Sequence, residues 1–133
     1  LRARVIPFSD IIPLPPLEKV GLDEFSTSED PATYEAMTYR HTIFLREDFQ
    51  SEVLYFHELI HVLQWERLGE NNFLLAYIAG LLESGYNASP LEEMAFSLQE
   101  KFRHGVLPND VTGRVHELTD AVWTRLVRAY SLA

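Results

Sequence analysis

The pattern of apolar and polar positions predicts four helices from about residue 49 onward. The first is apolar nearly all round, which is typical of a helix that runs through a core, and the second is almost wholly apolar. The third begins with Ser89 and Pro90, residues that favour the N-cap and the first helical position. The fourth carries a single apolar stripe. The expected ranges are about 49–68, 72–83, 90–103 and 114–130.

The amino-acid pattern in the N-terminal part of the chain predicts a small sheet. Residues 34–45 are rich in Thr, Tyr, Ile and Phe and predict one or two strands, at Thr38–Tyr39 and Thr42–Leu45. Residues 1–33 contain repeated prolines, which exclude a regular helix and a central strand, so we expect an extended surface segment there. The predicted fold is α+β and mainly α, a single domain over 1–133 whose core is 34–133.

Composition narrows the class of protein. A chain of 133 residues, 47% hydrophobic and 23% charged, fits one globular domain. The longest apolar run, 73–82, is about half of the ~20 residues that a membrane span needs. A net charge of -9 argues against nucleic acid or an anionic membrane as a partner. The absence of cysteine excludes disulfides and leaves His and carboxylates as the plausible zinc ligands.

No signal-peptide pattern is present, so we expect a cytoplasmic protein. The sequence begins at Leu1 rather than Met, which leaves open whether a targeting segment precedes it.

The strongest chemical signal is the His-Glu-x-x-His pattern within the first predicted helix. His57 and His61 lie one turn apart and ~40° apart in azimuth, so both rings can reach one ion. Glu58 points ~100° away, a poor direction for a ligand but a good one for a base beside a metal-activated water. The chain's own His and Glu frequencies give about 0.02 chance matches. The alternative is a pair of ordinary core or surface histidines.

A zinc site of this kind needs a third protein ligand and an open position. The third helix offers Glu92, which borders its apolar side, and Glu93, which faces water. Glu92 is therefore the candidate ligand. The alternative is a capping box, in which Glu92 bonds the backbone amide of Ser89. His104 and Glu83 are weaker candidates.

These residues resemble the gluzincin-type zinc metallopeptidases, in particular small bacterial members including the ImmA/IrrE-like set. The matching stretches are His57–Trp65 and Ser89–Phe96, and the resemblance covers about residues 36–103. It implies a zincin-like helical core in which His57, His61 and Glu92 bind zinc and Glu58 is the catalytic base. It also implies that a strand within 39–45 aligns an extended peptide.

The chain departs from larger gluzincins because it has no recognisable downstream domain with a His or Tyr to stabilise the oxyanion. Tyr77, Tyr86, Arg103 and His104 are candidates by position, and none can be assigned.

Two functions follow as hypotheses. The first is a zinc-dependent metallopeptidase that hydrolyses a peptide or protein substrate through metal-activated water, with Glu58 as general base. The second is a catalytically weak or inactive metal-binding module that recognises a protein partner. A metal-free helical interaction domain is a third interpretation, in which the histidines only pack.

Overall fold

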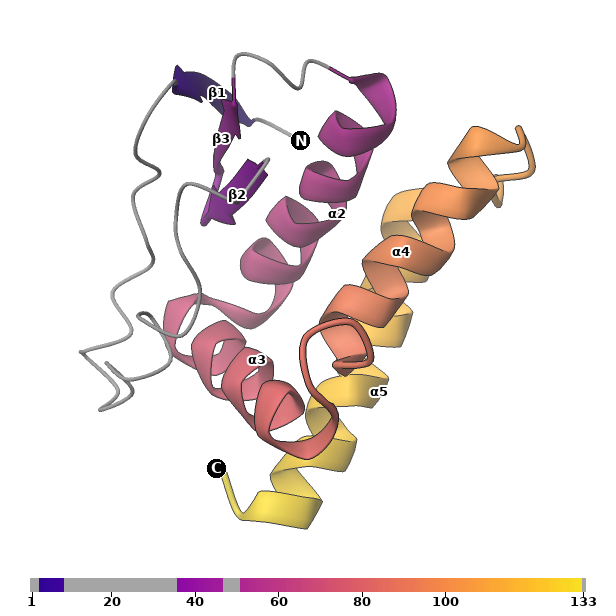
Figure 1. Ribbon diagram of the computed structural model, residues 1–133. Coiled ribbons are helices and arrows are strands. Elements are labelled where there is room, and N and C mark those ends of the chain that lie inside the picture. Colours follow the sequence, from indigo (N-terminus) through magenta and orange to yellow (C-terminus); the bar gives the residue numbers. More distant parts are fainter. Residues whose placement is uncertain (1–2, 9–35, 47–50, 133) are drawn as a thin grey trace.

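The computed structural model describes residues 3–8, 36–46 and 51–132, and these form a mainly helical α+β fold, as predicted. Most of the expected surface segment 1–33 lies outside the described residues. In chain order the elements are β1 (Arg4–Phe8), β2 (Ala36–Tyr39), β3 (Thr42–Arg46), α2 (Glu52–Leu68), α3 (Glu70–Ser84), α4 (Pro90–Arg103) and α5 (Val111–Tyr130) (Figure 1).

The sheet has the order β1-β3-β2, with β3 parallel to β1 and antiparallel to β2. Two of its strands were predicted, but the prediction for residues 4–8 was incomplete, because this extended segment pairs with β3. Pro7 is tolerated there because β1 lies at the edge of the sheet that the described strands form, where a missing backbone N–H need not break the ladder. The β2–β3 turn places Arg40 at φ 55°.

Helix α2 lies between the sheet and the other three helices (Figure 1). On its sheet side Val62 packs in a cluster with Ile43 and Leu45. On the other side Ile60 and Leu63 join the larger core formed with α3, α4 and α5. The prediction that a helix apolar nearly all round runs through the core is confirmed.

Side-chain caps fix where α2 and α5 begin. The Ser51 hydroxyl accepts from the third helical amide, so α2 begins at Glu52 rather than at about 49. Asp110 Oδ1 accepts a 2.9 Å bond from Gly113 N, so α5 begins at Val111 rather than at about 114. A glycine inside the first turn obscured that start in the sequence.

Gly69 separates α2 from α3 with a single residue. Its φ of 81° suits glycine, and its N–H closes α2 on the carbonyl of Trp65. Helix α3 therefore begins at Glu70, two residues before the predicted start at about 72. Helix α4 spans the predicted residues.

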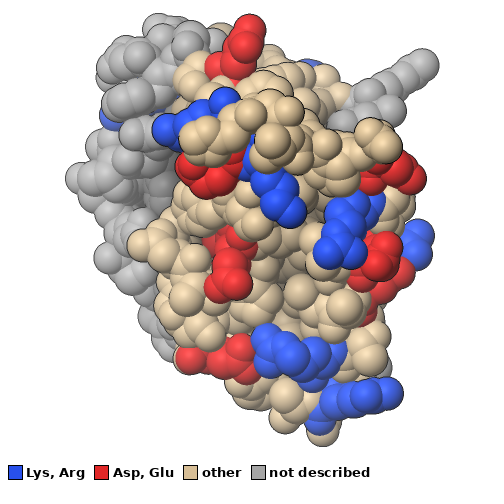
Figure 2. Space-filling model, turned by 90° about the vertical axis from the view of Figure 1, so that its right-hand side faces the viewer, with Lys and Arg blue, Asp and Glu red and all other residues tan. Residues whose placement is uncertain are grey.

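Ion pairs connect α5 to its neighbours at the surface. Arg67 of α2 pairs with Asp120, and Arg125 of α5 pairs with Glu83 of α3. The face shown in Figure 2 mixes acidic and basic side chains and carries no continuous basic stripe. None of the helices in the described part of the chain combines the length and apolar character needed to cross a bilayer.

Candidate metal centre

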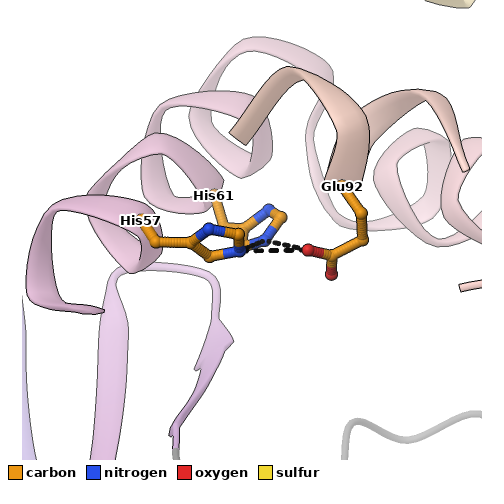
Figure 3. Close-up of side chains that lie close together, drawn as sticks. All are labelled: His57, His61 and Glu92. Carbon is orange, nitrogen blue, oxygen red and sulfur yellow. Dashed lines mark hydrogen bonds and ion pairs between the residues drawn. The ribbon is translucent and has the colours of Figure 1, made fainter. Parts of the chain in front are cut away.

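Three side-chain atoms converge between α2 and α4 (Figure 3). His57 Nε2 lies 3.2 Å from His61 Nε2, and Glu92 Oε1 lies 3.1 Å from the first and 3.0 Å from the second. All three residues are buried. The structure thus brings together the three ligands proposed from the sequence.

Helix geometry explains this convergence. The spacing of four residues places both histidines on one side of α2. In the first turn of α4, the buried Leu91 and Ala95 direct the adjacent Glu92 inward, whereas Glu93 is exposed. The wheel prediction for the two glutamates is confirmed.

The capping-box alternative for Glu92 is wrong. The backbone N–H and the hydroxyl of Ser89 both donate to the carbonyl of Tyr86, at 3.3 and 2.9 Å. The Glu92 carboxylate instead contacts His57, His61 and Tyr77. The weaker candidates lie elsewhere: Glu83 accepts from Arg125, and the exposed His104 pairs with Glu100.

The Nδ1 atom of each imidazole, which points away from the centre, lies within hydrogen-bond distance of a glutamine side-chain oxygen. His61 Nδ1 lies 2.8 Å from Gln64 Oε1, and the Gln64 amide nitrogen donates to the carbonyl of Leu91 at 3.0 Å. Because a carbonyl only accepts, this second bond fixes which way the amide faces, and His61 must donate from Nδ1. His57 Nδ1 lies 2.8 Å from Gln99 Oε1. In the neutral His61 ring Nε2 then carries a lone pair that faces the centre, and an acceptor at Gln99 favours the same state for His57.

The donor set fits a metal ion. Two imidazole lone pairs and a carboxylate oxygen that face one another repel unless a cation lies between them. Zinc bonds of 2.0–2.1 Å in tetrahedral geometry would place the ligand atoms about 3.3 Å apart. The observed separations of 3.0 to 3.2 Å are close to that value. The group can therefore hold a metal ion with little rearrangement.

The pKa shifts of His61 and Glu92 show that this centre favours positive charge. Burial alone would lower the pKa of His61, but the charge and hydrogen bond of Glu92 raise it to about 9. Burial alone would raise the pKa of Glu92, but His61 and His57 outweigh burial and lower it. A proton and a metal ion therefore compete for the same position.

Glu58 is buried beside these three residues. Thr38 of β2 donates a 2.8 Å hydrogen bond to its Oε1, and Oε2 lies 4.0 Å from His57 Nε2. Burial raises the pKa of Glu58, against the lowering effects of both histidines and Thr38. The carboxylate is thus next to the centre without being one of its converging atoms.

Sequence reasoning did not predict the hydrogen bonds that these four residues make, and it named Tyr77 only as a candidate oxyanion donor. Gln64 had a usable signal, since a residue three positions after His61 lies on the same helix face. Gln99, Tyr77 and Thr38 reach the site from other elements, so no local spacing marks them.

The positional candidates for an oxyanion donor are now placed. The Tyr77 hydroxyl donates to Glu92 Oε2 at 2.7 Å. Arg103 and His104 are exposed and pair with Glu100. Tyr86 is also exposed. The structure therefore shows Tyr77 as a hydrogen-bond partner of Glu92.

No protein-family model, curated protein or solved structure matches the chain. The class of the protein is accordingly defined by its own fold and site: an α+β, mainly α fold with a buried group of two histidines and a glutamate that could hold a metal ion.

Proposed function

We propose that the protein is a zinc-dependent metallopeptidase with a zincin-like core. The observation that carries the proposal is the convergence of His57 Nε2, His61 Nε2 and Glu92 Oε1 within 3.2 Å of one another, beside a second buried carboxylate, that of Glu58. Two imidazoles and one carboxylate are a donor set that suits zinc and leaves a coordination position for water. The gluzincin resemblance points to the same ligands.

Glu58 supplies the proton chemistry in this proposal. Bound zinc would supply the Lewis acidity that makes water nucleophilic near neutral pH. Glu58 Oε2 faces the centre and takes the proton from the attacking water, then returns it to the leaving amine.

The edge of β2 is the candidate place for an extended peptide. β3 is paired on both sides, so the peptide-aligning strand expected within 39–45 cannot be β3. β2 pairs with β3 on one side, and no other described strand pairs with its opposite edge. Thr38 of this strand bonds Glu58, which puts the edge near the proposed base.

One observation favours the second candidate, a metal-binding module that recognises a protein and cleaves nothing. Tyr77, the positional oxyanion candidate nearest the ligands, is already bonded to Glu92. Loss of one such donor typically costs 10²–10³ in turnover. A protein of this kind would bind zinc tightly and show no turnover.

The test combines metal analysis with Glu58→Gln. Zinc should bind with a stoichiometry of about one, and the wild type should cleave members of a broad peptide library. Glu58→Gln should keep the zinc and lose about 10²–10⁴-fold in turnover. Glu93→Gln is the matched control, because it makes the same change at an exposed position and should leave turnover unchanged. Equal hydrolysis by Glu58→Gln would contradict the mechanism, and zinc binding without cleavage would establish the second candidate.

A further inference from the structure

Gln64 is a polar side chain in the middle of an apolar core. It lies on α2 and is fully buried, with 0% of its surface exposed. Its oxygen lies 2.8 Å from His61 Nδ1, and its nitrogen donates to the Leu91 carbonyl at 3.0 Å and to Met94 Sδ at 3.3 Å. Both ends of the amide are therefore satisfied within the protein.

The two main bonds connect parts of the same candidate site. His61 is one of the proposed ligands, and Leu91 directly precedes Glu92, the ligand on α4. Burying an amide without hydrogen-bond partners lowers the stability of the fold by about 1–3 kcal/mol. A glutamine in the core is therefore tolerated only when both the oxygen and the nitrogen of its amide are bonded. An apolar side chain would fill the same space without that requirement.

We infer that Gln64 is a positioning residue that fixes two of the three metal ligands relative to each other. This inference rests on the metal-binding half of the proposed function. By accepting from His61 Nδ1, Gln64 sets the tautomer that leaves Nε2 free for the ion. By donating to Leu91, it holds the first turn of α4 where Glu92 Oε1 lies 3.0 Å from that nitrogen.

The inference predicts what happens without the amide. The His61 ring loses its acceptor, so either of its nitrogens can face the centre. The backbone at the start of α4 also loses its bond to Gln64 of α2. Because groups that orient metal ligands typically contribute 10–100-fold to metal affinity, Gln64→Met should weaken zinc binding by about that factor.

The test uses Zn²⁺ as the probe and two measurements. Competition with a chelator of known affinity gives the zinc dissociation constant of the wild type and of Gln64→Met. Nitrogen-15 NMR of the histidine rings shows which nitrogen of His61 is protonated in the zinc-loaded protein. We expect a protonated Nδ1 in the wild type and a mixture of ring states in the variant.

Thr119→Val is the matched control. Thr119 is also fully buried, and its hydroxyl contacts Met94 Sδ at 3.7 Å without touching a ligand. Its removal perturbs core packing near α4 but should leave the zinc dissociation constant and the His61 ring state unchanged.

The outcomes separate the two proposals. A wild type that does not bind Zn²⁺ contradicts the proposed function itself. A wild type that binds through Nδ1 of His61, or a Gln64→Met variant that binds as tightly as the wild type, overturns the role of Gln64 while the metal site stands. If Gln64→Met does not fold, zinc ligation through Nδ1 of His61 in the wild type would still overturn the inference.

Discussion

The Tyr77 hydroxyl donates a 2.7 Å hydrogen bond to Glu92 Oε2, the carboxylate oxygen that does not contact the histidines. The other oxygen, Oε1, lies 3.0 and 3.1 Å from the two imidazole nitrogens. Burial and the nearby Glu92 charge raise the pKa of Tyr77 well above its ordinary value, so the hydroxyl remains a donor at any working pH. The two carboxylate oxygens thus have separate roles.

Tyr77→Phe should weaken zinc binding about tenfold, because the carboxylate loses the bond that orients it. The free energy of unfolding of the metal-free protein should fall by about 1 kcal/mol. Chelator competition and urea titration measure the two effects. Tyr130→Phe is the control, since that hydroxyl bonds the exposed Glu83. Unchanged zinc affinity in Tyr77→Phe would show that the other contacts suffice to place Glu92.

Gln99→Glu should tighten zinc binding by about tenfold. A carboxylate accepts more strongly from His57 Nδ1 than an amide oxygen does and makes the ring a better donor to the metal. Gln99 is only half-buried, so it tolerates a charge. Ser97→Glu, an exposed site on the same helix, controls for net charge. If both variants shift the affinity equally, the effect is the added charge and not the bond to His57.

Zinc should stabilise the fold. A ligand that binds only the native state at 100 times its dissociation constant adds about 2.7 kcal/mol. Thermal unfolding should therefore show a higher midpoint with Zn²⁺, which a chelator reverses. Glu92→Gln should largely remove the shift because it replaces the anionic ligand. A midpoint indifferent to zinc and chelator would instead support the metal-free helical interaction domain.

The ion pair between Glu83 of α3 and Arg125 of α5 should make the stability of the fold depend on pH in the acid range. Hydrogen bonds from Arg125 and Tyr130 lower the pKa of Glu83 below its ordinary value of 4.5. A carboxylate whose pKa is lower in the folded state stabilises the fold above the unfolded pKa, and this contribution is lost as the pH falls through the folded pKa. Arg125→Met should therefore be destabilised relative to the wild type at pH 7, and the difference should shrink below pH ~4.5.

Urea titrations at several pH values measure that difference. Arg128→Met, which removes the same charge from an exposed position on α5, should show a smaller and flatter difference. An Arg125→Met difference that does not change with pH would mean that the pair contributes nothing that titrates with Glu83.

The candidate site was predictable where its information is local. Helical spacing alone placed His57, Glu58 and His61, and the apolar positions around Glu92 showed that this glutamate faces inward. The choice between ligand and cap for Glu92 was not local, because it depends on where α4 lies relative to α2.

The same distinction holds for the fold. The four helices follow from periodicity, but their ends depend on single capping bonds such as that of Asp110. Strand β1 was not predicted because its partner, β3, is more than 30 residues away in sequence. Pro7 also argued against a strand, although proline is compatible with a strand at the edge of a sheet.

Gly80 offers a test of how closely α3 must approach the start of α4. A Cβ at this position would lie 2.8 Å from Pro90 Cδ and 3.3 Å from Ser89 Cβ. The proline ring is part of the backbone and cannot rotate away, so Gly80→Ala must move the two helices apart. We expect a cost of about 1–3 kcal/mol from this overpacking, reduced by up to about 1 kcal/mol because alanine favours helix.

Gly80→Ala should also weaken zinc binding, because Glu92 lies in the turn that begins at Pro90. Val115→Ala is the control, since it opens a cavity in α5 at a residue that is not a ligand. Both variants should unfold at lower urea than the wild type, but only Gly80→Ala should lose zinc affinity. Equal zinc affinity in the two would mean that α4 can shift at its first turn while Glu92 still reaches the histidines.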